Sequence, residues 1–478
     1  MKGKILLYIL CGTLVLNQTS CDSFLDVKPK SSMSEDDIFS SEVGYQQALT
    51  GVYASMAERS LYGDQLSMGF VSALAQNYVS TAHGFVFKES TALNYTSSEV
   101  KAISEGIWSN SYNAIAGLNN ILGHIDTKGA MFTGDNYALI KGEALGLRAY
   151  LHFELLRLFA PTIATGADAQ AIPYLTSIGA GSQEPERVSG FIAKALKDLD
   201  EAKQLLDKVD PILKGDSNRR FQMNTIAVSG LRARVNLYAG NQTKAYEDAQ
   251  SVIKSGINRF VTNAEISAAA GLRDRLFSKE QVFSLRVLKI KEWVETGLSA
   301  YFRYTTSLSS NNLTRTRANF QTLYETAAGG STDYRYVYLV ENDGAIAYPS
   351  KFWQTWSGTN RIDRLDQTVP LLRLSEMYYI AAETAPTPTE GVELLNQVRK
   401  NRGLGELNTV DATSVFLTNE ITKEYQKEFY AEGQLFFYYK RLNFGRMQFS
   451  SSSLTASSYI LPIPESETEF NPGYNNLK

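Results

Sequence analysis

Apolar residues recur at intervals of three or four in three stretches of the chain, which is the spacing of one face of an α-helix. Between residues 224 and 240 this face consists of Ala227, Leu231, Val235 and Tyr238. Asn224 is a suitable N-cap, Gly240 predicts a stop, and the small residues Ala245 and Ala249 then allow a second helix to pack closely. The sequence therefore predicts a helix–turn–helix unit over 224–254, similar in length to a tetratricopeptide repeat (TPR).

Two further helix pairs are predicted over 137–206 and 371–401. In the first, a helix over Tyr137–Phe159 is stopped by Pro161 and is followed by a second helix over Ser189–Leu206. In the second, Leu371–Glu383 and Glu390–Asn401 are separated by a turn with two prolines. Because solenoid repeats must stack to bury a core, the three pairs predict a mostly α-helical, TPR-containing scaffold.

Two long segments, 61–100 and 258–370, lack helical periodicity and are rich in Gly, Ser, Thr, Asn and aromatic residues. Only Gln281–Val287 alternates enough to predict a short strand. Irregular segments of this length usually have a function or a structure of their own. Since binding residues are concentrated on loops held by a rigid scaffold, we expect these loops and short strands to form the ligand face.

The amino terminus has the pattern of a bacterial lipoprotein signal. Lys2 and Lys4 precede an apolar run, Ile5–Leu16, which is too short to span a bilayer. Small polar residues then lead to Cys21, although Gln18 stands where a lipobox usually has Leu. We expect residues 1–20 to be removed, Cys21 to be the lipid attachment site, and 21–478 to form a single domain. A free thiol at Cys21 is the alternative, and it suits an oxidising compartment less well.

Composition argues against several functional classes. The chain has 47 basic and 50 acidic residues, for a formal charge of −3, whereas a nucleic-acid-binding protein normally has a basic stripe. Two Cys and three His, with no HExxH, GxSxG, phosphate-loop or GxGxxG pattern, predict neither a metal site, a cofactor nor catalysis. A glycosidase with paired carboxylates remains an alternative because spacing alone cannot locate such a pair.

Acidic residues near the carboxyl end are interpreted as structural. Glu424, Glu428 and Glu432 recur every four residues, a helical row expected to order neighbouring Arg and Lys side chains. On or near the helix predicted at 371–383, Arg373, Glu376 and Glu383 are expected to form a structural ion pair at i, i+3 spacing.

Several stretches resemble the SusD/RagB-like family of outer-membrane nutrient-binding lipoproteins. They are CDSFLDVKP at Cys21–Pro29, LLRLSEMYYIAAE at Leu371–Glu383, LNQVRKNRGL at Leu395–Leu404, the helix at Glu424–Leu442, and the LPIP…NPGY tail at Leu461–Tyr474. Their order and spacing extend the resemblance over essentially the whole mature chain. Leu435 and Tyr438 depart from the family, which often has Arg and Asp there, and this weakens only a local ion pair.

The resemblance implies a SusD-like helical fold, anchored by lipid at the outer membrane of a Bacteroidetes-type bacterium and facing the cell exterior. It implies a non-catalytic protein that captures an oligosaccharide or polysaccharide and passes it to a partner, a SusC-like TonB-dependent transporter barrel. Some relatives serve peptide uptake, so a peptide-binding or protein-interaction TPR lipoprotein of an uptake complex is the alternative.

The candidate ligand-binding residues are chosen on physical grounds, because the resemblance carries no ligand motif. Sugar rings stack their C–H faces on aromatic rings, and their hydroxyls need polar partners. The candidates in 61–100 are Asn77, Tyr78, His83, Phe85, Phe87 and Tyr95, and those in 258–370 are Trp293, Tyr301, Arg303 and Tyr304. Trp293 is the strongest because its neighbours are polar, whereas Trp353 and Trp356 lie in a segment that resembles a structural part of the family.

Overall fold

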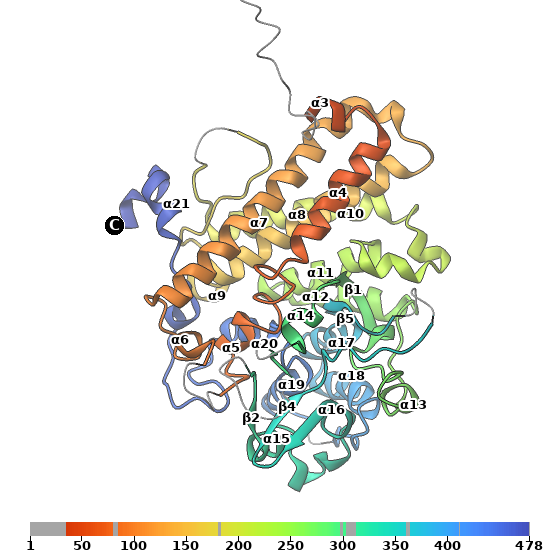
Figure 1. The fold of residues 1–478 in the computed structure, drawn as a ribbon, viewed down its shortest axis with the longest axis vertical. Coiled ribbons are helices and arrows are strands. Elements are labelled where there is room, and N and C mark those ends of the chain that lie inside the picture. The colour runs from red at the N-terminus through yellow and green to blue at the C-terminus, as the bar shows by residue number, and fades with distance from the viewer. Residues whose placement is uncertain are drawn as a thin grey trace, which may run out of the picture.

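The computed structural model describes residues 35–79, 85–179, 183–296, 300–302, 312–359, 364–410 and 412–477. Helices dominate, and the long ones of the first half of the chain cross the upper part of Figure 1. The helices of the first half are α3 (Glu35–Ile38), α4 (Glu42–Met56), α5 (Phe70–Leu74), α6 (Lys88–Thr91), α7 (Ser98–Ile125), α8 (Asn136–Phe159), α9 (Ile163–Gly166) and α10 (Val188–Leu206). The predicted mostly helical fold class is confirmed.

The second half of the chain mixes helices with short strands and fills the lower part of the view (Figure 1). Its helices are α11 (Thr225–Tyr238), α12 (Gln242–Lys254), α13 (Asn263–Ile266), α14 (Lys291–Val294), α15 (Arg317–Leu323), α16 (Tyr334–Leu339), α17 (Leu374–Glu383), α18 (Pro388–Lys400), α19 (Ser414–Glu428), α20 (Gln434–Arg441) and α21 (Glu465–Phe470). Short 3₁₀ helices lie at Asp126–Met131, Pro211–Lys214, Ser217–Phe221, Ser278–Glu280, Thr326–Ala328, Gly330–Thr332, Ala456–Tyr459 and Pro472–Leu477.

Helices occupy each of the three regions where pairs are expected, as α8 with α10, α11 with α12, and α17 with α18. Asn224 caps α11 as predicted, because its Oδ1 accepts the N–H groups of Ile226 and Ala227 at 3.0 and 2.9 Å. Ala245 and Ala249 are fully buried, and α12 contacts both α11 and α17. The small residues therefore mark a close helix–helix contact, which confirms that prediction.

The strands form two small antiparallel sheets. β1 (Gln281–Arg286) pairs with β5 (Thr368–Arg373), and β4 (Ile346–Pro349) lies between β2 (Arg315–Thr316) and β3 (Val340–Asp343). The strand predicted over 281–287 is therefore β1. The helix predicted to begin at Leu371 was wrong at its start, since that residue lies in β5 and α17 begins at Leu374. A short apolar run fits a buried strand as well as a helix, and pairing with β1 decides between them.

The ion pair expected among Arg373, Glu376 and Glu383 does not form, because Arg373 lies on β5 and not on the helix. Each side chain instead pairs across elements: Arg373 with Glu428 and Glu432, Glu376 with Arg234, and Glu383 with Arg441. The acidic row orders Arg and Lys side chains as expected, since Glu424 and Glu428 bind arginines from other elements and Glu432 binds Lys351 and Arg373. It is helical only in part, because α19 ends at Glu428, before Glu432. None of the helices in the described ranges is long and apolar enough to cross a membrane.

Candidate functional site

Two of the predicted aromatic residues meet around an arginine that the sequence did not single out. Arg59, in the turn that follows α4, places its guanidinium carbon 5.2 Å from the centre of the Trp293 ring and 5.9 Å from that of Tyr301. Asp64 holds this arginine with a 2.8 Å ion pair, and the Arg59 Nη2 also donates to the Tyr301 hydroxyl at 3.0 Å. We call Arg59, Asp64, Trp293 and Tyr301 the Arg59 cluster.

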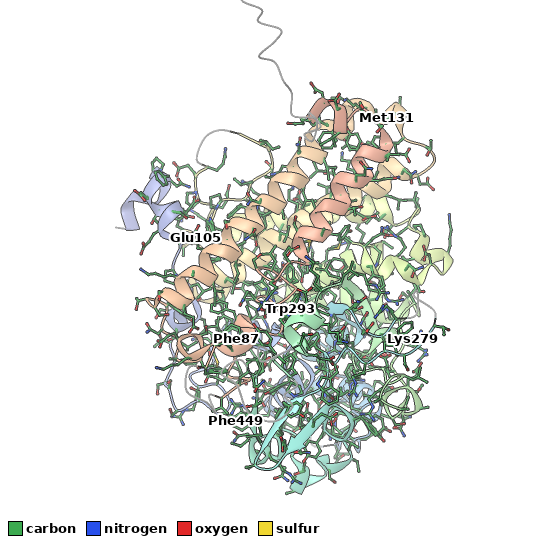
Figure 2. The ribbon with its side chains drawn as sticks, in the orientation of Figure 1. Phe87, Glu105, Met131, Lys279, Trp293 and Phe449 are labelled. Carbon is green, nitrogen blue, oxygen red and sulfur yellow. The ribbon has the colours of Figure 1, made fainter. Side chains whose placement is uncertain are left out.

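The backbone brings the two rings together. Trp293 lies on the short helix α14, and the Tyr301 N–H donates to the Trp293 carbonyl at 2.9 Å. The Tyr301 hydroxyl in turn donates to Asp64 at 2.9 Å. Figure 2 shows Trp293 in the middle of the molecule, where α14 meets the upper helices. The cluster thus joins the loop-rich segment near 258–370 to the first loop-rich segment.

Three side chains of the cluster are buried, and the fourth, Arg59, is half-exposed. The Trp293 and Tyr301 side chains are buried, and the Asp64 carboxylate is fully covered, whereas 52% of the Arg59 side chain is exposed. The aromatic rings therefore do not form an open platform in this structure. They hold the Arg59 guanidinium at the surface, and a cation over an aromatic ring gains about 0.5–1 kcal/mol at such a site.

Several polar atoms of the cluster have unused hydrogen-bonding capacity. Within the described part of the chain, the Trp293 Nε1 and the Asp64 Oδ1 are buried without a partner. The Arg59 Nη1 likewise has no hydrogen bond to any described residue, while the Nε and Nη2 are both used. Buried polar groups in native proteins are nearly always paired, so the Trp293 Nε1 and the Asp64 Oδ1 are exceptions within the described residues.

Protonation states in the cluster follow from burial and from charge. Burial raises the pKa of Asp64, while the Arg59 charge and the hydrogen bonds from Arg59 and Tyr301 oppose that shift. Burial and the neighbouring Asp64 carboxylate raise the pKa of the Tyr301 hydroxyl far above its usual value. Tyr301 is therefore a neutral donor to Asp64 at physiological pH, and Arg59 remains a cation.

The other candidates from 61–100 lie deeper or elsewhere. Phe87 packs edge-on against Tyr301 with ring centres 6.1 Å apart, and Phe85 contacts Phe87. Asn77 and Tyr78 are buried in structural roles, since the Asn77 Oδ1 accepts the Ala431 N–H and the Tyr78 hydroxyl donates to the Met68 carbonyl. The Asn77 carbonyl and side chain thus connect the loop to the turn after α19.

Tyr95 is separate from the Arg59 cluster, because its hydroxyl donates to the Ser458 carbonyl at 2.6 Å near the carboxyl end of the chain. Trp353 is half-buried and donates its Nε1 to the Phe302 carbonyl at 3.0 Å, which suits the structural role expected of it. Trp356 stacks with the Arg364 guanidinium at 5.0 Å. Cys21, His83, Arg303 and Tyr304 lie outside the described residues.

Sequence reasoning missed Arg59 and Asp64 for a clear reason. The irregular segment predicted from the sequence begins at Leu61, so Arg59 lies outside it, and Asp64 was not selected although Tyr62 and Gln65 are its neighbours. Their partner Tyr301 is 242 residues from Arg59 along the chain. A charged pair on either side of Gly63 was the available signal, but nothing in the sequence connected it to Trp293.

Comparisons with known proteins agree on one family. Residues 23–237 match a family model described as "Starch-binding associating with outer membrane", and residues 342–453 match the model of the SusD family. SusD-like protein P2 of Formosa agariphila is 23% identical over 552 residues, which cover 99% of this chain and 100% of that protein.

Solved structures share the fold. A SusD superfamily protein from Bacteroides thetaiotaomicron has a TM-score of 0.72 at 22% identity, over 91% of this chain and 98% of that one. A protein from Bacteroides vulgatus, described as a putative sugar binding protein, has a TM-score of 0.70 at 21% identity, over 91% of this chain and 97% of that one. At this level of identity the likeness shows the fold alone.

Proposed function

Because this chain belongs to the SusD/RagB-like family, whose members bind glycans for nutrient capture, we propose that it captures an oligosaccharide or polysaccharide at the cell surface and delivers it to a SusC-like TonB-dependent transporter barrel. The role is binding and delivery without catalysis. The observation that carries the proposal is the match of residues 23–237 to a model described as "Starch-binding associating with outer membrane", together with the match of residues 342–453 to the SusD family model.

We further propose that ligand hydroxyls bind at the Arg59 cluster. The Arg59 guanidinium is half-exposed, is held in place by Asp64 and Tyr301, and has a terminal nitrogen free to donate to a sugar hydroxyl or ring oxygen. A buried scaffold that fixes a few polar groups is the usual construction of a small-molecule site.

The anchor and location belong to the same proposal. Family descriptions place such proteins at the outer membrane. We propose that acylation of Cys21 anchors this protein there with its body facing the cell exterior, since that cysteine follows the signal-like segment 1–20 and precedes the described helices.

Calorimetric titration with the glycan of the organism's own uptake locus tests the site. Removing the Arg59 donors in an Arg59→Met variant should weaken binding about 10- to 100-fold, since a hydrogen bond to a charged group contributes about 1.5–3 kcal/mol. Arg259→Met is the matched control, because the Arg259 side chain is 53% exposed and is also paired with a carboxylate, that of Glu265, at 2.7 Å.

A second comparison tests the aromatic support. Trp293→Ala should weaken glycan binding far more than Trp353→Ala, with unchanged helix content by circular dichroism. Trp293 supports the half-exposed Arg59, whereas the arginine over the Trp353 ring, Arg275, is buried and the Trp353 Nε1 donates to a backbone carbonyl. Wild-type affinity in both Arg59→Met and Trp293→Ala would remove the cluster from the site. Binding to peptides, with no response to any glycan, would favour the peptide-uptake alternative.

A further inference from the structure

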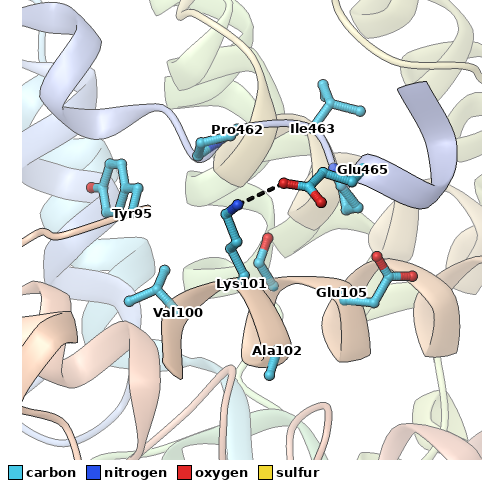
Figure 3. Close-up of a pocket in the computed structure, with 10 residues that line it drawn as sticks. Tyr95, Val100, Lys101, Ala102, Glu105, Pro462, Ile463 and Glu465 are labelled. Carbon is cyan, nitrogen blue, oxygen red and sulfur yellow. Dashed lines mark hydrogen bonds and ion pairs between the residues drawn. The ribbon is translucent and has the colours of Figure 1, made fainter. Parts of the chain in front are cut away.

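Two cavities lie on α7, one on each side of the point where the carboxyl-terminal segment crosses that helix. The first, of about 290 Å³, lies between Tyr95, the start of α7 and residues 462–465 (Figure 3). The second, of about 340 Å³, lies between the next turns of α7, residues 173–179 with Gln183, and residues 466–467. Glu105 lines both cavities, so they are neighbours along one helix.

The floor of both cavities is a single row of α7 side chains. Val100, Ser104, Trp108 and Tyr112 are spaced by four residues and so lie on the same face of the helix. The first two line the first cavity and the other two line the second. The next row, Lys101, Glu105, Ser109 and Asn113, forms the polar rim. We call these two rows and the segment 462–467 the α7 groove.

One atom in the floor is unsatisfied. Ser104 is only 5% exposed, and its Oγ has no hydrogen-bond partner among the described residues. A buried hydroxyl without a partner is unfavourable unless a bound molecule completes its hydrogen bonds. On the rim, Ser109 and Asn113 also make no side-chain hydrogen bond with the described residues, which leaves a hydroxyl and an amide available.

The segment over the groove is held by exposed polar contacts. The Lys101 Nζ pairs with Glu465 at 2.6 Å, as Figure 3 shows, and the Ser466 hydroxyl donates to the Glu105 carboxylate at 2.8 Å. Solvent screens these two contacts, so residues 465–466 are held weakly between two firmer anchors: the buried Leu461, whose N–H donates to the Leu158 carbonyl at 3.0 Å, and Asn471, whose Nδ2 donates to the Gln183 carbonyl at 3.0 Å. Lifting the segment would join the two cavities into one groove along four turns of α7.

We propose that the α7 groove is a second glycan-binding subsite, separate from the Arg59 cluster, that takes a neutral oligosaccharide. Tyr95 lines one end, and Trp108 and Tyr112 line the other. Trp108 is 4% exposed and both tyrosines are half-buried, so only ring edges reach the cavities to meet C–H groups. The carboxylate, amide and hydroxyl groups between them suit sugar hydroxyls. The carboxylates of Glu105, Glu465 and Glu467 would repel an anionic sugar.

The neutral-glycan assignment rests on the proposed function, and binding stoichiometry tests it separately. Calorimetric titration uses neutral probes, namely maltohexaose, cellohexaose, xylohexaose and laminarihexaose, with hexagalacturonate as the anionic probe. We expect two molecules of one neutral hexasaccharide per wild-type chain and no binding of hexagalacturonate in the groove. Arg59→Met should remove one of the two binding events and leave the other.

Ser109→Trp, which fills the second cavity from the rim, and Glu105→Ala, which removes the shared carboxylate, should each remove the remaining event or weaken it at least tenfold. Ala116→Trp is the matched control, because Ala116 is exposed on the same helix and lines neither cavity. Hydrogen–deuterium exchange gives a second measurement: the neutral probe should protect residues 98–113 and 461–467 in both the wild type and Arg59→Met.

The groove proposal would be overturned, and the proposed function kept, by one outcome: a single bound hexasaccharide per wild-type chain, whose binding is lost in Arg59→Met and unchanged in Ser109→Trp. Loss of binding in Ser109→Trp but not in Arg59→Met would keep the groove and remove the cluster from the site. No response to any of the four neutral probes would count against both proposals. Equal loss in Ser109→Trp and Ala116→Trp would show a general effect of the added ring and overturn the groove.

Discussion

Single buried charges shape the lower half of the molecule. The Glu428 carboxylate, fully buried on α19, accepts hydrogen bonds from Arg335 at 2.8 Å, from Arg402 at 2.7 Å and from Arg373. Burial acts to raise the pKa of Glu428, but the guanidinium groups outweigh it and hold that pKa well below its usual value. The carboxylate is therefore the shared anion for three elements that are distant in sequence.

Removing that charge should leave three buried cations without their common partner. Glu428→Gln is expected to lower the free energy of unfolding by about 3–5 kcal/mol, the usual result of breaking a buried ion pair from one side. Urea titration at pH 7 measures it, and Glu393→Gln, on the exposed side of α18, is the control. A loss under 1 kcal/mol would show that the network does not depend on Glu428.

The buried, neutral ring of His152 should make the stability of the protein depend on pH. It is fully buried on α8, its Nδ1 lies 2.9 Å from the Arg148 carbonyl, and its Nε2 accepts the Leu175 N–H at 2.9 Å. That pair of bonds requires the neutral ring, and burial lowers the pKa of His152 to about 3. The unfolded chain, with an imidazole pKa near 6.5, therefore binds more protons than the folded one between about pH 6.5 and pH 3.

Stability should accordingly fall as the pH drops below about 6.5, by up to about 1.4 kcal/mol per pH unit from this residue alone. We expect His152→Gln to be less stable than the wild type at pH 7, and the difference to shrink toward pH 4.5. Urea unfolding across that range measures both proteins, and the carboxylates common to them cancel. A difference that stays constant with pH would show that His152 does not titrate on unfolding.

At the scale of elements, the sequence pattern predicted those features that depend on residues close together in the chain. The N-cap at Asn224, the small contact residues of α12 and the strand over 281–287 were all readable, because each depends on neighbours a few positions away. The start of α17 was not, because the apolar run before it becomes β5 only by pairing with β1. Tertiary pairing, not propensity, made that choice.

The α12 contact provides a test of the helix pair. Ala249→Leu adds bulk where α12 contacts α11 and α17, so the free energy of unfolding should fall by roughly 1–3 kcal/mol through overpacking. Lys244→Leu adds the same side chain at an exposed position of α12 and should change stability little. Thermal and urea unfolding compare the two variants. Equal melting temperatures for Ala249→Leu and the wild type would contradict close packing at this contact.

At the scale of the whole molecule, the fold was predictable and the candidate site only in part. The three predicted helix pairs and the order of the family stretches sufficed for the fold class. Trp293 and Tyr301 could be named from the sequence because they are aromatic residues in a polar, irregular segment. Arg59 and Asp64 could not, because they contact these residues only once the chain is folded. The α7 groove has the same origin, because residues near 100 and near 465 meet only in three dimensions.

The proposed anchor decides where this whole molecule works. Wild-type protein expressed in a Bacteroidetes host should sediment with membranes, resist extraction by high salt and dissolve in detergent, because buried acyl chains contribute about 0.8 kcal/mol per methylene and two or more chains hold stably. Cys21→Ala should appear in the soluble fraction and lose labelling by an alkynyl palmitate analogue. Cys11→Ala is the matched control: Cys11 lies in the segment expected to be removed, so that variant should sediment and label as the wild type does. Labelling that persists in Cys21→Ala would place the lipid elsewhere and remove Cys21 as the anchor.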